Sequence, residues 1–311
     1  MSDIAPPENA SPSLRPDRQG VTLVLGGGGF KGMAHVGVFL ALEEHGIPVR
    51  SIIGTSAGAL LGACYAHLMD ARAVKDHVLQ FLNSEEFQRK GFVSFEDSSK
   101  GNGVGSFLSR VVSGIKRQVA LERMFRRNSA FGGAALRFVV RGLLPNLAFQ
   151  DLSLPVAVAA LDIASGEEVL ITEGPIRSAV CASSSVPGFF PPVDRDGRLL
   201  VDAGIVDNLP TRLARSLGAM RIVAVDLSAG LAPIPPGEVG MSLLLRAQDI
   251  STRIANRARG GFADVVLKPE LDGRSWLDPE QPADVMDAGY RATIEAMADI
   301  RDLLGRTGQP T

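Results

Sequence analysis

The chain contains few cysteines, which excludes two common ways of stabilising or equipping a domain. Only Cys64 and Cys181 occur among its 311 residues, far apart and within apolar segments. Two thiols cannot form a disulfide framework or a four-ligand zinc site. We therefore expect both cysteines to be reduced core residues, and we expect no metal.

The chain also lacks a long apolar run. None approaches the ~20 residues that a membrane-spanning helix requires. Residues 1–20 are rich in proline, serine and charge and have no apolar stretch of the kind found in a secretory signal. We expect flexible tails at 1–20 and 306–311, a cytoplasmic protein, and lipid contact that is at most peripheral, at the inner face of the membrane.

Excess charge of either sign is absent as well. The formal net charge is -2 and the pI is about 6.1, so there is no overall electrostatic reason to expect a nucleic-acid partner. Hydrophobic residues make up 45% of the chain, enough for a substantial core. The sequence does not indicate an oligomeric state.

Two strand–loop–helix units open the ordered part of the sequence. Residues 21–25 (VTLVL) predict a strand and 33–44 a helix; residues 49–54 (VRSIIG) and 59–69 repeat the pattern. Two such units in succession predict a parallel sheet. Further strands are expected at 155–161, 168–171, 199–202, 221–227 and 263–267, and helices at 176–182, 211–217, 241–259 and 284–304. The predicted fold class is α/β, a three-layer α/β/α domain over 21–305 with a mainly parallel central sheet and a helical insertion.

The insertion covers residues 83–150 and interrupts the alternation of strands and helices. It is rich in basic residues and poor in acids, the basic set being Arg110, Lys116, Arg117, Arg123, Arg126, Arg127, Arg137 and Arg141. Charged helix faces usually point into water, which makes the insertion a solvated cap. The alternative is a lid that rests on an anionic lipid surface.

The segment GTSAG at Gly54 to Gly58 matches GxSxG and lies between a predicted strand and a predicted helix. The small residues Thr55 and Ala57 permit a sharp turn around Ser56. Such a turn exposes the serine hydroxyl at the end of the sheet, with a helix N-terminus behind it that favours negative charge. Ser56 is therefore the candidate nucleophile.

A second glycine-rich loop, GGGGFKG at Gly26 to Gly32, also joins a strand to a helix and satisfies GxGxxG. A nucleotide-binding oxidoreductase would need an acidic residue about 20 positions on, at the end of the second strand. That place holds Gly54, Thr55 and Ser56 and no carboxylate. The bare amides of the loop are better suited to an oxyanion hole facing Ser56.

The positions of the histidines in the chain restrict which residue can be the base that activates Ser56. An α/β-hydrolase triad places its histidine last in the chain, but all four histidines, His35, His45, His67 and His77, lie in the first quarter. The base is then a carboxylate, a lysine or one of these early histidines.

Three aspartates follow predicted strands, where open α/β sheets hold their sites: Asp162, Asp202 and Asp226. Asp202 is followed by the small residues Ala203 and Gly204, which leave room for close approach, although an aspartate there could equally cap a turn. The pattern does not choose among the three.

Four segments in order, GGGGFKG at 26–32, GTSAG at 54–58, ASSSVPGFFPPV at 182–193 and VDAGIVDNLP at 201–210, resemble the patatin-like phospholipase family, especially its compact bacterial members. The resemblance covers 21–304. It implies a Ser56–Asp202 dyad without histidine. It also implies an oxyanion hole made by the loop residues Gly27, Gly28, Gly29, Phe30, Lys31 and Gly32, with Lys31 where the family has arginine or lysine.

One position departs from the family pattern, which reads Asp-Gly-Gly or Asp-Gly-Ala where this chain reads Asp202-Ala203-Gly204. Alanine disfavours positive φ, so the dyad would be strained if Ala203 had to be left-handed.

The predicted activity is that of a serine acyl hydrolase, a phospholipase A or lipid esterase that works through an acyl-enzyme and needs no cofactor. Phe107, Phe131, Phe189 and Phe190 line an acyl groove or pack the core. The alternatives are an acyltransferase or thioesterase with the same dyad and a catalytically silent lipid-binding or interaction protein of the same fold.

Overall fold

The computed structural model describes residues 20–90, 129, 131–228, 241–271, 273–276 and 279–305. The predicted tails, apart from Gly20, lie outside this range. So do Phe107 and the six basic residues of the insertion between 110 and 127.

In this part of the chain, eight strands form one sheet with the order β5-β6-β3-β2-β1-β7-β8, and β4 pairs with β3. Strands β1, β2, β3, β7 and β8 run parallel to one another, β4 and β6 pair antiparallel with β3, and β5 pairs antiparallel with β6. The strands are β1 (Val21–Leu25), β2 (Val49–Thr55), β3 (Val156–Asp162), β4 (Glu168–Ile171), β5 (Val193–Arg195), β6 (Arg198–Asp202), β7 (Ile222–Val225) and β8 (Val265–Leu267). The sequence did not predict β5, a three-residue strand with no apolar run.

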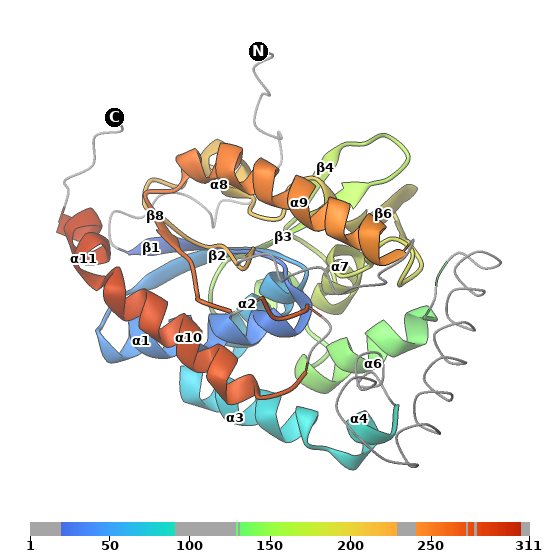
Figure 1. The fold of residues 1–311 in the computed structure, drawn as a ribbon, viewed down its shortest axis with the longest axis horizontal. Helices are drawn as coiled ribbons and strands as arrows, with labels where there is room; N and C mark the ends of the chain where they lie inside the picture. The colour runs from blue at the N-terminus through green and yellow to red at the C-terminus, as the bar shows by residue number, and fades with distance from the viewer. Residues whose placement is uncertain are drawn as a thin grey trace.

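Helices cover both faces of the sheet, so the predicted three-layer α/β/α fold is confirmed (Figure 1). Helices α1, α2, α3 and α10 lie on one side and α8 and α9 on the other. The described helices are α1 (Met33–Glu44), α2 (Ala57–Leu68), α3 (Ala71–Leu82), α4 (Glu85–Lys90), α6 (Gly133–Leu143), α7 (Ile176–Ser183), α8 (Thr211–Ser216), α9 (Met241–Arg259), α10 (Pro282–Glu295) and α11 (Met297–Gly305).

The central strands carry apolar residues toward both faces of the sheet because each face has its own core. In β1, Leu23 and Leu25 join the large cluster under α1 and α2, whereas Val24 joins the smaller cluster with Ala214 of α8. In β7, Val223 and Ile222 divide in the same way. Alternate side chains of a strand point to opposite faces, so double coverage produces the continuous apolar runs seen in the sequence.

The predicted C-terminal helix needs correction, and the description of the helical insertion needs extension. The helix expected over 284–304 is two helices, α10 and α11, with Ala296 between them at φ -90° and ψ 3°. The bend lets both helices bury apolar residues in the same core. Helix α6, in the insertion, also buries Leu136, Val140 and Leu143 in the large cluster, so α6 itself is part of the core.

Among the described helices, none is both long enough and apolar enough to cross a membrane.

Candidate active site

The pairing of strand β3 explains why Ser56 and Asp202 meet. Strand β4 pairs with residues 158–161 of β3, so it occupies one edge of that strand. Strands β2 and β6 both overlap β4 along β3, at 156–159 and 160–162, and must therefore share the opposite edge. Thr55 pairs with Ala159 and Asp202 with the next residue, Ala160, so the C-terminal ends of β2 and β6 meet.

Ser56 lies in the sharp turn that the sequence predicts between β2 and α2. Its φ of 53° and ψ of -119° are unusual for a residue with a side chain, and such strain is typical of functional turns. The flanking glycines have no room for a side chain, because a Cβ on Gly58 would lie 2.2 Å from the Leu25 carbonyl oxygen and one on Gly54 2.5 Å from the Ala59 nitrogen. The Ser56 amide donates to Ser183 Oγ at 2.7 Å, which fixes the turn.

The glycine-rich loop lies directly against this turn. A Cβ on Gly27 would lie 3.0 Å from the Ser56 Cβ. The Asn208 side chain brackets the loop: its Oδ1 accepts from the Gly27 amide and its Nδ2 donates to the Gly27 carbonyl, both at 3.0 Å. The short helix η2 (Gly29–Gly32) then leads into α1.

Several of the loop amides already have partners. The Phe30 amide donates to the Trp276 carbonyl at 2.9 Å and the Lys31 amide to the Gly28 carbonyl at 3.1 Å. Within the described residues, the amides of Gly28 and Gly29 have no hydrogen-bond acceptor. These two amides are therefore the donors that the loop leaves free beside Ser56. Gly32 packs against the start of α2, where a Cβ would lie 2.7 Å from the Ala57 Cβ.

Asp202 is the buried carboxylate at the end of β6. Burial raises its pKa to about 6, and hydrogen bonds from the Ser56 hydroxyl and the Gly204 amide lower the pKa in part. The Gly204 amide donates to Asp202 Oδ1 at 2.7 Å. A Cβ on Gly204 would lie 3.0 Å from that same oxygen, so glycine suits this close approach.

Ala203, the departure from the family pattern, does not strain the site. It is not among the residues with positive φ, and it begins the short helix η4 (Ala203–Ile205). Its methyl group is buried with Ala159, Leu161 and Val201. The extra methyl therefore contributes to packing.

The other two strand-end aspartates have different partners. Asp162 accepts from the Ala164 amide at 3.1 Å and the Ser165 hydroxyl at 3.0 Å, which closes a turn. Asp226 accepts from the Ser228 amide and hydroxyl at 3.0 and 2.5 Å and from Asn256 Nδ2 at 2.9 Å.

Within the described residues, no hydrogen bond joins any of the four histidines to Ser56. His35 is fully buried, its Nε2 lies 2.8 Å from the Gly26 carbonyl oxygen, and burial lowers its pKa to about 4. A neutral His35 therefore donates to the glycine-rich loop. His77 Nε2 lies 3.2 Å from the Leu143 carbonyl and His45 Nδ1 3.4 Å from an Arg301 nitrogen. His67 occupies the last turn of α2.

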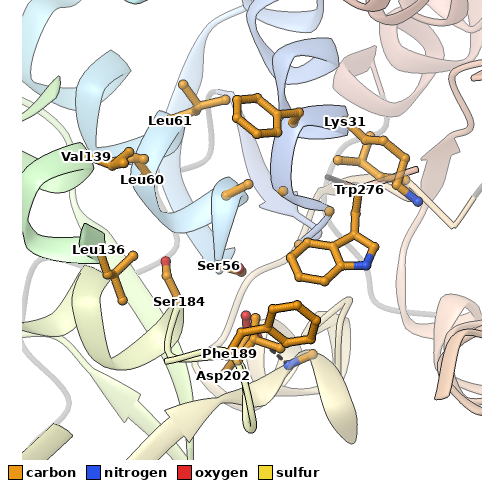
Figure 2. Close-up of a pocket in the computed structure, with 18 of the residues that line it drawn as sticks. Lys31, Ser56, Leu60, Leu61, Leu136, Val139, Ser184, Phe189, Asp202 and Trp276 are labelled. Carbon is orange, nitrogen blue, oxygen red and sulfur yellow. Dashed lines mark hydrogen bonds between the residues drawn. The ribbon is translucent and has the colours of Figure 1, made fainter. Parts of the chain in front are cut away.

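Ser56 and Asp202 open into a mainly apolar pocket of about 290 Å³ (Figure 2). Three of the phenylalanines noted in the sequence line it, and Phe189 packs edge-on against Trp276 with ring centroids 5.0 Å apart. Lys31 also lines the pocket, and burial lowers the pKa of its amine. The apolar lining residues include Leu60, Leu61, Val78, Phe81, Phe87, Phe131, Leu136, Val139, Leu143, Phe189, Phe190 and Trp276.

Three residues of the site were missed as individual contributors. Asn208 and Ser183 fall within the segments that resemble the family, but only the fold shows that they hold the Gly27 and Ser56 backbones. Trp276 comes from far along the chain, in a loop without a motif. No sequence signal marks Trp276 as a pocket residue.

Comparison with known proteins points to one family. The family model for patatin-like phospholipase matches residues 23–215. A patatin-like phospholipase domain-containing protein of Caenorhabditis elegans is 32% identical over 307 residues, which cover 90% of this chain and 21% of that protein. An NTE family protein of Mycobacterium bovis is 27% identical over 305 residues, covering 89% and 47%. The chain thus spans less than half the length of these relatives.

Two solved structures also align with the chain. VipD from Legionella pneumophila aligns with a TM-score of 0.48 and 16% identity, covering 92% of this chain and 67% of that chain. ExoU from Pseudomonas aeruginosa aligns with a TM-score of 0.43 and 18% identity, covering 94% and 54%. The family match spans more than half of the sequence and includes Ser56, Asp202 and both glycine-containing loops, so the chain belongs to the patatin-like phospholipase family.

Proposed function

We propose that this protein hydrolyses carboxylic esters of lipids, with Ser56 as the nucleophile and Asp202 as its base. The observation that carries the proposal is the pairing of a strained, pocket-facing serine with a buried carboxylate whose pKa is raised to about 6. A base with a pKa near the working pH is better matched to proton transfer than an ordinary aspartate. Family membership supports lipid esters as the substrate class.

In the proposed cycle, Asp202 takes the Ser56 proton as the serine oxygen attacks the ester carbonyl carbon. The resulting oxyanion receives hydrogen bonds from the Gly28 and Gly29 amides, the two loop donors without a partner in the described structure. Collapse breaks the ester C–O bond, and the leaving alcohol takes the proton from Asp202. The acyl group remains on Ser56.

Water completes the cycle in the second half. Asp202 accepts a proton from the water that attacks the acyl-enzyme, the carboxylic acid leaves, and the proton returns to Ser56. These steps use no metal or other cofactor. Ser183 and Asn208 act as positioning residues, since they contact the Ser56 and Gly27 backbones and not the reacting atoms.

The pocket supports an acyl chain as the part of the substrate that is buried. Its phenylalanine and leucine side chains favour a hydrocarbon, and Ser56, Gly28 and Gly29 line the same pocket. Removing apolar surface from water contributes roughly 0.8 kcal/mol per buried methylene. Longer acyl chains should therefore raise kcat/KM until the pocket is filled.

The test combines labelling and turnover. We expect a fluorophosphonate to modify Ser56, located by peptide mass spectrometry, and the protein to hydrolyse p-nitrophenyl esters with a preference for longer chains and to release fatty acid from a phospholipid. Ser56→Ala should abolish both activities. Ser184→Ala is the matched control, because Ser184 lines the same pocket but makes no hydrogen bond to the Asp202 carboxylate in the described structure.

Two outcomes would overturn the proposal. The first is a folded protein that neither labels nor cleaves any ester, which identifies a binding protein of this fold. The second is transfer of the acyl group to an added alcohol with little free acid, which identifies an acyltransferase using the same two residues.

A further inference from the structure

Helix α9 (Met241–Arg259) is amphipathic in the reverse sense from an ordinary surface helix. Where the structure describes its side chains, the protein-facing row, spaced by four residues, is polar: Gln248, Thr252 and Asn256. Gln248 donates to the Ile205 carbonyl at 3.0 Å, Thr252 to the Gly204 carbonyl at 3.1 Å and Asn256 to Asp226 at 2.9 Å. Hydrogen bonds thus hold these three positions to the protein.

The opposite row of α9 is apolar and exposed. Leu243, Ile250 and Ile254 are 47%, 40% and 64% exposed, and Ala247, between them on the same face, is exposed too. We call these four residues the outer row. A solvent-facing helix of a soluble domain normally carries its apolar residues inward. An apolar outer row over a polar inner row indicates that something apolar covers this face.

Arginines border the outer row. Helical spacing places Arg246 and Arg257 beside it, while Arg253 donates to the Ser228 carbonyl at 2.7 Å on the protein side. An apolar stripe with arginines along its edge suits the boundary between the headgroups and acyl chains of an anionic bilayer.

The helix also forms part of the pocket and contacts the loop after Asp202. Gln248, Asp249 and Thr252 line the same pocket as Ser56, and α9 lies over the end of the sheet that carries β6 (Figure 1). Thr252 binds the carbonyl of Gly204, whose amide in turn binds Asp202. An external surface that binds α9 would therefore lie beside the pocket.

We propose that the outer row of α9 docks the protein on the surface of an anionic phospholipid bilayer and sets the pocket beside the lipids it acts on. The proposal rests on the proposed function for the identity of the substrate, but docking does not require chemistry. The outer row enters the headgroup boundary, and Arg246 and Arg257 contact lipid phosphates. The acyl ester then reaches Ser56 without leaving the interface for bulk water.

The test is co-sedimentation of the full chain, carrying Ser56→Ala so that no lipid is consumed, with vesicles of phosphatidylglycerol and phosphatidylcholine. We expect Ile250→Gln/Ile254→Gln to weaken vesicle binding by about tenfold or more, since two apolar side chains no longer enter the bilayer. Met220→Gln/Ile294→Gln is the matched control, since these residues lie outside α9 and are 40% and 37% exposed. It should bind as the parent does.

In the Ser56 background, the same Ile250→Gln/Ile254→Gln change should leave hydrolysis of a soluble short-chain ester within about twofold, because these exposed side chains are outside the pocket lining. Hydrolysis of vesicle lipid should fall with binding. If vesicle binding persists while no ester is hydrolysed, the proposed function fails and the docking surface stands.

Three results would overturn the docking proposal. One is wild-type vesicle binding by the outer-row variant. Another is a parent protein that does not bind anionic vesicles at all. The third is sedimentation showing a parent dimer that the outer-row variant converts to a monomer, which assigns the face to a second copy of the chain.

Discussion

The loops that follow β6 and β7 begin with the same local structure and differ in what surrounds it. Asp202 and Asp226 each accept a hydrogen bond from the amide two residues on, at 2.7 Å from Gly204 and 3.0 Å from Ser228. Asp226 accepts two further hydrogen bonds, from the Ser228 hydroxyl and Asn256. Asp202 is buried with fewer donors, which leaves its pKa raised to about 6.

The comparison shows how one motif serves two roles. The Asp226 carboxylate accepts three hydrogen bonds and holds a loop in place. A buried carboxylate that faces one serine hydroxyl and one amide is a poorly stabilised anion, and hence a base that accepts a proton readily. The neighbouring side chains, supplied by distant segments, decide between these roles.

The largest expected effect separates the two aspartates directly. Ser56→Ala and Asp202→Asn should each lower kcat/KM for a soluble ester by about 10⁴-fold, because each removes a member of the reacting pair. Asp226→Asn should lower it by no more than about fivefold, since its carboxylate serves the fold. Comparable losses for Asp202→Asn and Asp226→Asn, with both variants folded by circular dichroism, would contradict the assignment.

Asn208→Ala should have the next largest effect. It removes both hydrogen bonds that bracket Gly27, so the neighbouring amides of Gly28 and Gly29 lose their fixed position. We expect a fall of about 10²-fold in kcat with a smaller change in KM, as for loss of oxyanion stabilisation. Steady-state kinetics measures the changes in kcat and KM separately. A rise in KM alone would show that Asn208 only shapes the pocket.

The pH profile should follow the Asp202 carboxylate. Its pKa of about 6 predicts that kcat/KM rises about tenfold per pH unit below 6 and levels above it, because only the ionised form accepts the serine proton. Asp226→Asn should leave the midpoint in place. A wild-type profile that is flat down to pH 4.5 would exclude Asp202 as the base.

Asp202→Asn should also stabilise the protein at alkaline pH. Because the folded-state pKa is raised above the ordinary value of 3.8, the folded state binds more protons than the unfolded state between about pH 4 and 6, and wild-type stability falls as pH rises through that window. We expect a gain of about 3 kcal/mol for the variant at pH 8, disappearing near pH 4. Denaturant unfolding at pH 4 and pH 8 checks both the direction of the stability change and the pH range in which it appears. As the comparison, Asp226→Asn should lower the stability at pH 8.

The smallest effect is expected at Ala203. Since its φ is not positive and its methyl group is buried, Ala203→Gly should leave kcat/KM within about twofold and lower stability by about 1 kcal/mol. Thermal unfolding and ester turnover measure the two quantities. A marked gain in activity would show that the alanine does strain the dyad.

The fold was largely predictable because its strands are buried on both faces and its first two helices follow glycine-rich turns. Strand β5 was missed because Val193–Arg195 carries no apolar pattern, and the break at Ala296 has no proline or glycine to mark it. Ser56 could be named from its turn. Asp202 could not be separated from Asp162 and Asp226 by pattern, because the difference lies in the pairing of β2 and β6 on one edge of β3.

The contributions of Ser183, Asn208 and Trp276 could not be predicted for a related reason. Each acts through the backbone of another segment: a serine hydroxyl on the Ser56 amide, an amide side chain on Gly27, and a carbonyl on Phe30. Such contacts depend on which loops the sheet brings together. No spacing or motif in the sequence marks such contacts, so the roles of these residues cannot be inferred from it.

The most direct test of the central claim is the rate at which a fluorophosphonate labels Ser56 as a function of pH, in the wild type, Asp202→Asn and Asp226→Asn. We predict that labelling of the wild type and of Asp226→Asn accelerates through pH 6, and that Asp202→Asn labels at least about 10³-fold more slowly with no such rise. Labelling of Asp202→Asn at the wild-type rate would show that another group activates the serine.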